Sequence, residues 1–258
     1  MLPILVVSLE QSTGRRIEVA RHLTALNLPY QFFSAIDGHR LDSAELHTRY
    51  SEASAWRALG RPMTAGEIGC SLSHLAIYRQ MLEAELDELV IMEDDARAGP
   101  GLRYVLEHRD QWPRDWEVMY LYHLGNDASH LSFRGQSPLG PVYRVVRFSD
   151  RPLGTVAYAI RNSAASKLLD AGFPVSVPAD ELLNGYHIPV DITRYGVSPV
   201  VVEHGHPDGS HLAAERMVAN AAVRASQLGF ARFLPESVYR RSRRIAKFGK
   251  RFFRRHFV

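Results

Sequence analysis

The sequence has a single cysteine, Cys70, so no disulfide can form within the chain, and a lone thiol is compatible with a reducing compartment. It also lacks any run of about 18 to 20 apolar residues, the length that a membrane-spanning helix needs. Residues 1–8 have neither a basic start nor a small-residue cleavage site, so we expect a buried strand there and no signal peptide. These absences favour a protein that folds around its own apolar core.

Basic residues are concentrated at the C-terminal end of the chain. The whole sequence has a net charge of +3, yet residues 235–258 hold nine Lys and Arg and one acid, which leaves the remainder mildly acidic. Within residues 238–258 aromatic and basic side chains are interleaved, and Ile245, Phe248 and Phe252 fall at helical spacing. We expect an amphipathic tail that lies on an anionic membrane surface; nucleic-acid binding and a solvated tail are the alternatives.

The first part of the chain predicts a strand, a helix and a second strand. Residues 4–9 form a continuous apolar run, as in a strand covered on both faces. Ser12 or Thr13 can cap a helix that continues to about residue 26, and residues 30–36 predict a strand before the turn pair Asp37-Gly38. This order is typical of a parallel α/β unit.

The next predicted helix begins at a capping box, Thr64-Ala-Gly-Glu67, and continues to about residue 86. The remaining predicted strands are residues 89–92, 116–124, 142–148, 155–160 and 197–203, and the remaining predicted helices are 163–171 and 180–184. Residues 39–62 give no clear pattern. The sequence therefore predicts one main α/β domain, residues 1–234, followed by the basic tail.

Three consecutive acids, Glu93-Asp94-Asp95, directly follow the apolar residues 89–92. Ligands of open α/β sheets bind at the carboxyl ends of strands, where these side chains emerge. Adjacent carboxylates raise each other's pKa unless a cation compensates, and Mg²⁺ and Mn²⁺ prefer such oxygen ligands. In an extended chain, Glu93 and Asp95 point one way and Asp94 the other. The triplet favours a metal site, with an acidic turn exposed to water as the alternative.

The helix that begins near Thr64 carries a polar stripe. Glu67, Ser71, His74 and Tyr78 are spaced four, three and four residues apart, so they share one face, beside an apolar stripe of Ile and Leu. Such a pair of stripes can line the edge of a cleft. The alternative is structural: Glu67 caps the helix, and His74 is a histidine whose hydrogen bonds are satisfied on the surface or in the core.

Two acids, Asp180 and Glu181, follow Pro178 at an expected helix start. The helix dipole favours acids at that end, which gives them a structural explanation. The functional hypothesis is that one of them is a general base that deprotonates an acceptor hydroxyl.

Further candidates lie beside the first and last predicted strands. Arg15 and Arg16 follow the first strand, where a phosphate could meet helix amides and a guanidinium group. His204, His206 and Asp208 follow the last strand, where they could add a metal ligand or contact a pyrophosphate. Histidines in loops more often do neither.

Several stretches together resemble glycosyltransferase family 25, the lipooligosaccharide biosynthesis transferases. The two most specific are Met63-Thr-Ala-Gly-Glu-Ile-Gly-Cys-Ser-Leu-Ser-His74 and Val90-Ile-Met-Glu-Asp-Asp95. The supporting stretches are Val6-Val-Ser-Leu9 with Arg15-Arg16, Phe33-Ser-Ala-Ile-Asp-Gly38 and Gly154-Thr-Val-Ala-Tyr-Ala-Ile160. The resemblance covers roughly residues 3–210.

The resemblance implies a GT-A type fold, a Rossmann-like mixed sheet flanked by helices. It also implies a nucleotide-sugar donor, a divalent cation and inversion at the anomeric carbon. Family members are mainly galactosyltransferases that use UDP-galactose, others use glucose, and some modify collagen; this short chain with its basic tail resembles the bacterial branch. Glu93 stands where the family's Asp-any-Asp signature has its first Asp, so Glu93 either binds the metal or contacts ribose instead.

Roles follow from the resemblance. Glu93 and Asp95 are expected to hold Mn²⁺ or Mg²⁺ on the donor pyrophosphate, with His206 as a further ligand. Asp180 is the expected catalytic base, with Glu181 second. The residues expected to contact the donor or the acceptor are Ser8, Arg15, Arg16, Asp37, Glu67, Ser71 and His74.

The expected acceptor is a lipooligosaccharide or another lipid-linked glycan, reached from the cytoplasmic face of the bacterial inner membrane through the tail, and we expect no nucleic-acid partner. Two other classes of function stay open. A metal-dependent hydrolase or nucleotidyltransferase would release product from a nucleotide without a sugar acceptor. A non-catalytic adaptor on the same fold would tolerate loss of Asp95 and Asp180 but not loss of the tail.

Overall fold

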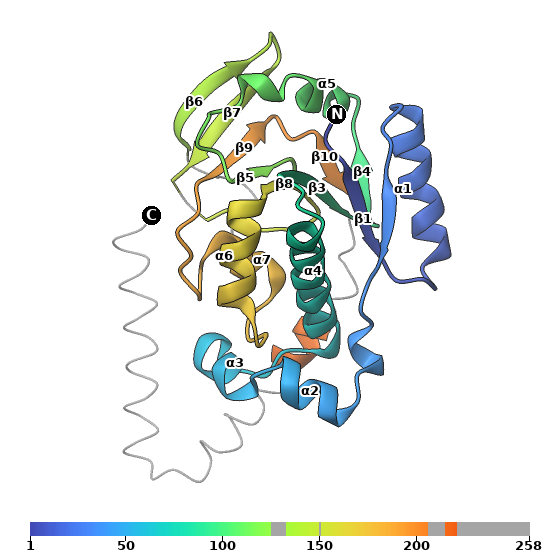
Figure 1. The fold of residues 1–258 in the computed structure, drawn as a ribbon, viewed down its shortest axis with the longest axis vertical. Helices are drawn as coiled ribbons and strands as arrows, with labels where there is room; N and C mark the ends of the chain where they lie inside the picture. Colours follow the sequence, from blue (N-terminus) through green and yellow to red (C-terminus); the bar gives the residue numbers. More distant parts are fainter. Residues whose placement is uncertain (125–132, 150, 206–214, 221–258) are drawn as a thin grey trace. The chain divides into compact units, whose positions relative to one another are not determined.

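The computed structural model of the chain describes residues 1–124, 133–149, 151–205 and 215–220 (Figure 1). The chain divides into two units, Met1–Ala213 and Ala214–Val258, and the first of them carries the sheets. The predicted amphipathic tail, residues 235–258, lies outside the described residues, so it stays a prediction, as does the domain boundary at residue 234. Among the helices of the described part, none is both long and apolar enough to span a bilayer.

Helices and strands alternate along the first unit. Its N-terminal half contains β1 (Ile4–Ser8), α1 (Thr13–Ala25), β2 (Gln31–Ser34), the 3-10 turn η1 (Gly38–Arg40), α2 (Ser43–Arg49), α3 (Glu52–Leu59), α4 (Ala65–Glu83), β3 (Glu88–Glu93), β4 (Ala96–Ala98), α5 (Gly101–Glu107) and η2 (Arg109–Gln111). Its C-terminal half contains β5 (Val118–Tyr120), β6 (Phe133–Leu139), β7 (Tyr143–Phe148), β8 (Ala157–Arg161), α6 (Asn162–Gly172), α7 (Ala179–Asn184), β9 (Arg194–Ser198) and β10 (Val202–His204).

The described strands form one large mixed sheet and a short ladder. The large sheet has the order β2-β1-β3-β8-β5-β9-β7-β6, and β4 pairs with β10. β1 lies parallel to β2 and β3, whereas β8 runs antiparallel to both β3 and β5. Val7 of β1 lies opposite Glu93 of β3, so the carboxyl ends of these two strands meet at one edge of the sheet. This register places Ser8 close to the acidic triplet.

Helices cover both faces of the sheet, so the central strands are buried on either side (Figure 1). Along β3, Leu89 and Ile91 join the core that includes α4, α6 and α7, while Val90 and Met92 join the core that includes α1 and α5. This alternation explains why β3 is a continuous apolar run in the sequence: a strand with period 2 and two covered faces needs apolar residues at every position.

The predicted fold class, a GT-A type mixed α/β sheet flanked by helices, is confirmed. The strand predicted at residues 197–203 is wrong: the structure has two strands, β9 and β10, that belong to different sheets. Pro199 lies between them and has no N–H to donate to a ladder. Helix α4 ends at Glu83, earlier than expected, because Glu85 adopts a left-handed backbone conformation with φ of 51°.

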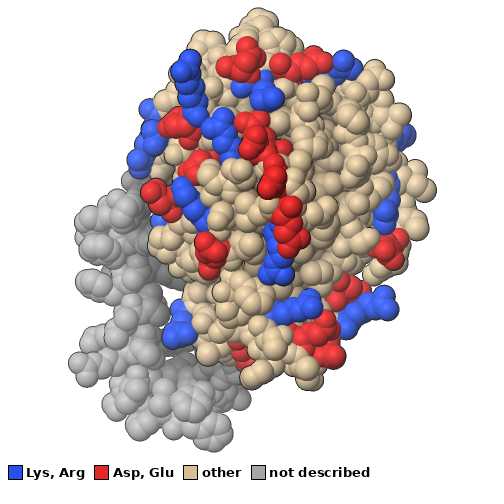
Figure 2. All heavy atoms as spheres, viewed as in Figure 1, with Lys and Arg blue, Asp and Glu red and all other residues tan. Residues whose placement is uncertain are grey.

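Acidic and basic side chains are interspersed on the face of the molecule shown in Figure 2. Over the described residues of that face, the charged side chains of both signs lie mainly at the left and centre of the view, and a broad area without charged side chains lies at the upper right. This distribution agrees with the sequence, in which the basic excess is confined to residues 235–258.

Candidate active site

The middle acid of the triplet, Asp94, joins β3 to β1 and α1. Its carboxylate accepts a hydrogen bond from Ser8 Oγ at 2.8 Å and forms an ion pair with Arg15 Nη1 at 3.2 Å. Burial raises the pKa of Asp94, and the contacts with Ser8 and Arg15 oppose that rise. Ser8 and Arg15, both predicted to contact the donor or the acceptor, are therefore brought to the triplet, where they hold Asp94.

Glu93 lies on a different side of the strand end, between α4 and the segment before β8. Thr155 Oγ1 donates a short hydrogen bond to Glu93 Oε1, and His74 Nε2 lies 3.6 Å from the same oxygen. The His74 ring is buried, and its Nδ1 is 2.7 Å from the hydroxyl of Tyr158. That hydroxyl is in turn 2.7 Å from the hydroxyl of Tyr78. A chain of buried polar groups from His74 through Tyr158 to Tyr78 thus fixes the orientation of the imidazole beside Glu93.

Asp95 faces a second histidine. His204 Nε2 lies 3.3 Å from Asp95 Oδ2, because the β4–β10 ladder places His204 opposite Ala96. The next residue closes the contact: the Gly205 N–H donates to the Asp95 carbonyl at 2.7 Å. A Cβ at Gly205 would lie 2.6 Å from that carbonyl oxygen, so only glycine fits without a shift. His206, the predicted third metal ligand, lies outside the described residues.

Glu93 and Asp95 are the residues that the sequence predicts as cation ligands. Their carboxylates stand at the carboxyl end of a central strand, each with a histidine beside it. Mn²⁺ accepts carboxylate and imidazole ligands, and Mg²⁺ accepts carboxylates and keeps several waters. The donor set fits the predicted cation, and the ligand roles of Glu93, Asp95 and His206 stay predictions.

The four residues of the predicted polar stripe on α4, Glu67, Ser71, His74 and Tyr78, are all buried. Glu67 is 1% exposed, and both its carboxylate oxygens accept hydrogen bonds from Arg61 at 2.7 Å. It also completes the predicted capping box with Thr64, which the structure confirms. Ser71 donates to the carbonyl of Val177 at 3.2 Å. In the structure these side chains hold α4 in place; a role in binding donor or acceptor stays a prediction.

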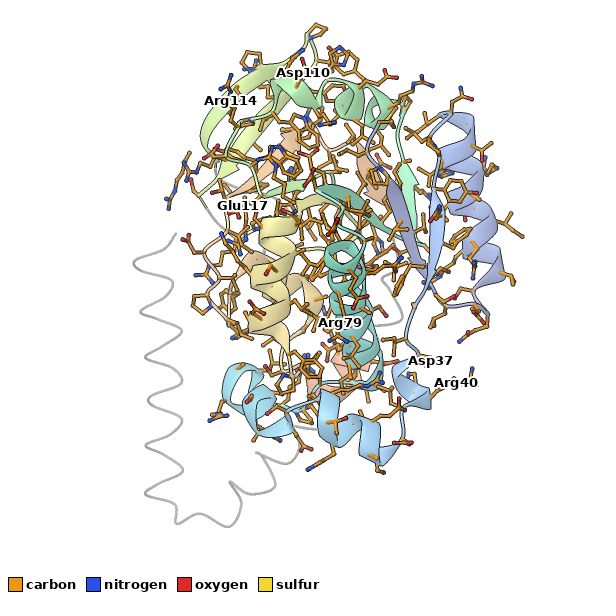
Figure 3. All side chains as sticks on the ribbon, viewed as in Figure 1. Asp37, Arg40, Arg79, Asp110, Arg114 and Glu117 are labelled. Atoms are coloured by element: carbon orange, nitrogen blue, oxygen red, sulfur yellow. The ribbon has the colours of Figure 1, made fainter. Side chains whose placement is uncertain are left out.

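The segment after β2 packs tightly on α4. Asp37 caps η1 by accepting from the His39 N–H at 3.0 Å, and it also accepts from Gln11 Nε2 at 3.2 Å. Figure 3 shows Asp37 and Arg40 near each other, on the segment that packs against α4. A Cβ at Gly38 would lie 1.8 Å from the Ala65 carbonyl oxygen of α4, which explains the glycine after Asp37.

Arg16 turns away from the triplet. Its guanidinium carbon lies 4.2 Å from the centre of the Phe32 ring, a cation–π contact that joins α1 to β2. The structure therefore separates the two neighbouring arginines: Arg15 contacts the acidic triplet and Arg16 does not.

Asp180 and Glu181 open α7, as predicted, and both are half-buried. Asp180 Oδ1 accepts from the Glu181 N–H at 3.1 Å, and Glu181 Oε2 lies 2.9 Å from His187 Nε2. Burial lowers the pKa of His187, with a smaller contribution from Arg151. Asp180 is also close enough to Tyr120 for its charge to contribute to the raised pKa of that buried hydroxyl.

A pocket of about 550 Å³ lies at the C-terminal end of α7. Four of its lining residues are arginines: Arg134, Arg147, Arg151 and Arg194. The Arg194 guanidinium donates to the carbonyls of Leu183, Val190 and Ile192, which hold it in place. The pocket is suited to anionic groups. The sequence did not point to it, because its arginines come from three different strands, β6, β7 and β9, and from a loop residue, Arg151.

Fold and site together place the chain among the α/β proteins with an open mixed sheet. Carboxylates and imidazoles lie together at the carboxyl end of β3, and proteins of this class bind ligands at the carboxyl ends of their strands. The family follows from the sequence. Residues 1–183 match the profile of "Glycosyltransferase family 25 (LPS biosynthesis protein)", and the chain belongs to that family. The predicted resemblance is confirmed.

Curated relatives include enzymes from animals. Procollagen galactosyltransferase 2 of Mus musculus is 26% identical over 228 residues, which is 80% of this chain and 35% of the mouse protein. A glycosyltransferase 25 family member of Anopheles gambiae is 36% identical over 103 residues, 39% of this chain and 17% of that protein. The chain spans about a third of the length of the mouse relative it matches.

Solved structures with a similar arrangement are distant in sequence. A glycosyltransferase involved in the glycosylation of the major capsid of PBCV-1 is 9% identical, with a TM-score of 0.38 over 76% of this chain and 80% of the other. A Drosophila β-1,4-galactosyltransferase 7 mutant in complex with manganese, UDP-Gal and xylobiose is 11% identical, with a TM-score of 0.35 over 80% of this chain and 71% of the other.

Proposed function

We propose that this protein is a metal-dependent hexosyltransferase that moves galactose from UDP-galactose to a sugar hydroxyl with inversion at the anomeric carbon. Membership of glycosyltransferase family 25 and the galactosyltransferases among the relatives support the class of reaction. The observation that carries the proposal is the position of Glu93 and Asp95 at the end of β3, beside His74 and His204. UDP-glucose is the alternative donor.

Glu93 and Asp95 would hold Mn²⁺ or Mg²⁺, and His204 is near enough to Asp95 to orient its carboxylate. When bound, the cation neutralises negative charge on the leaving pyrophosphate. Arg15 and Ser8 fix Asp94, so the strand end that carries the two ligands is held against β1. Ligands that are held in position before the substrate arrives need little reorganisation during the reaction.

Asp180 is the proposed general base. In a single displacement, the acceptor oxygen forms its bond to the anomeric carbon while the bond from that carbon to the UDP oxygen breaks on the opposite face. The acceptor hydroxyl proton passes to the Asp180 carboxylate, and UDP leaves with the bonding electron pair. The position of Asp180 in the first turn of α7 fixes its backbone, which supports a role that needs a defined orientation.

The proposed acceptor is a lipooligosaccharide or another lipid-linked glycan on the cytoplasmic face of a bacterial inner membrane. The description of the matched family as an LPS biosynthesis protein supports this choice. The basic and aromatic residues of segment 238–258 support contact with an anionic membrane surface.

The first test is release of UDP from a panel of UDP-sugars by the purified chain, with and without Mn²⁺. We expect cation-dependent release from UDP-galactose, and faster release when a glycan acceptor is added. Asp180→Asn should lower turnover at least 100-fold while donor binding persists, because general-base catalysis contributes roughly 10²- to 10⁴-fold. Asp170→Asn, which changes an exposed acid on α6, is the matched control. No cation-dependent release from any UDP-sugar would contradict the proposed function.

A further inference from the structure

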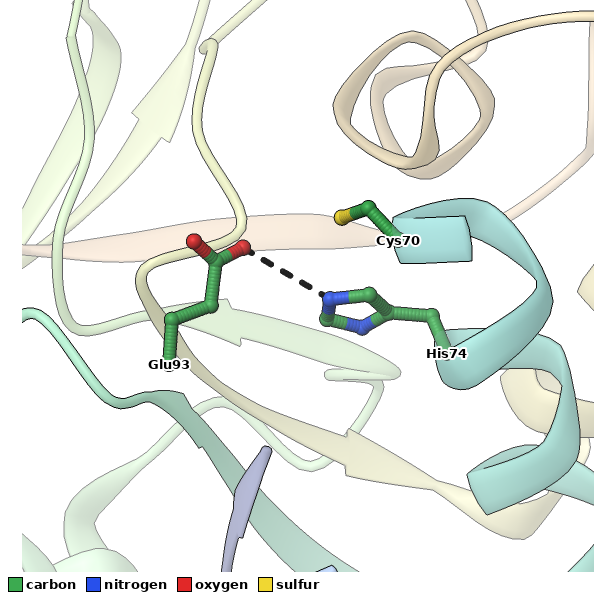
Figure 4. Close-up of side chains that lie close together, drawn as sticks. All are labelled: Cys70, His74 and Glu93. Carbon is green, nitrogen blue, oxygen red and sulfur yellow. Dashed lines mark ion pairs between the residues drawn. The ribbon is translucent and has the colours of Figure 1, made fainter. Parts of the chain in front are cut away.

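A second set of possible metal ligands lies next to the proposed donor site. Cys70 and His74 are four residues apart on α4, so their side chains share one face of the helix. Figure 4 shows both of them directed toward Glu93 at the end of β3. One ligand atom from each of the three residues, a sulfur, a nitrogen and an oxygen, lies within 4.8 Å of the other two.

The His74 ring is oriented toward this cluster. Its Nδ1 is bonded to Tyr158, whereas its Nε2 is buried and has no hydrogen-bond partner among the described residues. Buried polar atoms without a hydrogen bond are rare in native structures, so such an atom points to a missing ligand. When Nδ1–H donates to the Tyr158 hydroxyl and that hydroxyl donates to Tyr78, Nε2 is left with a lone pair directed at Glu93. A metal ligand needs that lone pair, and a fixed partner on the other ring nitrogen is typical of metal-binding histidines.

The spacing of His74 and Glu93 suits a shared ion better than a direct contact. The 3.6 Å between His74 Nε2 and Glu93 Oε1 is too long for a good hydrogen bond. Two ligands at about 2.0 to 2.2 Å from a tetrahedral Zn²⁺ lie roughly 3.4 Å apart. The observed separation is close to that edge length, and the Cys70 sulfur lies within reach on the same side.

We propose that Cys70 Sγ, His74 Nε2 and Glu93 form a binding site for a thiophilic divalent cation of the zinc class, with a fourth position open to water. The thiol proton leaves to solvent as the sulfur binds the ion. A sulfur, nitrogen and oxygen set selects Zn²⁺ over Mn²⁺ or Mg²⁺, which prefer oxygen. The site shares Glu93 with the cation site proposed at Glu93 and Asp95, and it adds the sulfur of Cys70 and the ring nitrogen of His74.

Sharing of Glu93 has a consequence that rests on the proposed function. A zinc ion bound by Cys70 and His74 draws the Glu93 carboxylate toward α4. That carboxylate is then no longer available to bind the cation of the donor site. Zinc should therefore inhibit the Mn²⁺-dependent reaction, and inhibition should depend on the sulfur of Cys70.

Binding of metal alone tests the site without nucleotide or sugar, so its outcome is separate from that of the proposed function. The full chain, treated with chelator and a thiol reductant, is titrated with Co²⁺ as a spectroscopic substitute for Zn²⁺, and Zn²⁺ is then added in competition. We expect one equivalent of Co²⁺ to give a thiolate-to-cobalt charge-transfer band, which Zn²⁺ abolishes. Cys70→Ser should remove the band and weaken Zn²⁺ binding at least tenfold.

The controls separate binding from folding. His47→Asn, at an exposed histidine on α2, should bind as the wild type does, whereas His74→Asn should not. Because His74 is buried and its variant can unfold, Cys70→Ser at a half-buried position gives the decisive comparison, with circular dichroism as the check on folding. Co²⁺ binding without a charge-transfer band, or equal Zn²⁺ affinity in wild type and Cys70→Ser, would overturn the proposal.

In the second arm, Zn²⁺ should inhibit Mn²⁺-dependent release of UDP less in Cys70→Ser than in wild type. Equal inhibition of the two would overturn the sharing of Glu93.

Discussion

Replacing Glu67 with Gln should destabilise the fold more than any exposed substitution on the same helix. Glu67 and Arg61 are 1% and 8% exposed, and two hydrogen bonds of 2.7 Å join them. Glu67→Gln keeps the shape of the side chain but leaves a buried guanidinium without its counter-charge. Breaking a buried ion pair on one side costs about 3–5 kcal/mol. For a chain of this size, that corresponds to a fall of roughly 6 to 20 °C in the melting temperature.

Urea unfolding and thermal melting, both followed by circular dichroism, measure the effect. Glu83→Gln, at an exposed acid near the end of α4, should change the free energy of unfolding by less than about 0.5 kcal/mol. The double variant Arg61→Met with Glu67→Leu should recover most of the loss, because an apolar pair of similar volume removes both buried charges. A loss below about 1 kcal/mol in Glu67→Gln would refute the claim that the pair holds α4 in place.

Two further predictions concern other parts of the chain. Burial would raise the pKa of Glu117, but hydrogen bonds from Lys167, Thr193 and Ser163 outweigh it, so the pKa is lowered. The carboxylate therefore adds stability above its unfolded pKa of about 4.3, and Glu117→Gln should lose stability at neutral pH, with a difference from wild type that vanishes as pH falls through the folded pKa. A constant difference at every pH in urea unfolding would contradict this. The full chain should sediment with anionic lipid vesicles but not with neutral ones, and deletion of residues 238–258 should abolish sedimentation with the anionic vesicles. If the shortened chain sediments with anionic vesicles as much as the full chain does, the membrane proposal is wrong.

Local patterns predicted local structure well. The Thr64–Glu67 capping box appears in the structure as expected, because its hydrogen bonds depend only on residues three positions apart. Helix α2 also begins at a capping box, formed by Asp42 and Glu45. Within residues 39–62, α2 and α3 each begin at a side-chain cap, Asp42 and Ser51 respectively.

Contacts between distant segments were harder to predict. The triplet and the polar stripe of α4 were both recognised, but Cys70 was not counted with His74 and Glu93. Only the register of β3 between β1 and β8, with α4 packed against that face, brings those side chains together. The stripe itself was expected to line a cleft, yet its residues are buried: Ser71 contacts the carbonyl of Val177, and His74 and Tyr78 contact Tyr158 of β8.

The three neighbouring acids of the triplet depend on three different parts of the molecule. Glu93 is tied to Thr155, Asp94 to Ser8 and Arg15, and Asp95 to His204. During divergence of the family, a change at position 94 should therefore be accompanied by changes at positions 8 and 15, and a change at position 95 by a change at position 204. A motif of consecutive residues in the sequence would then evolve as separate pairs, each with its own partner in space.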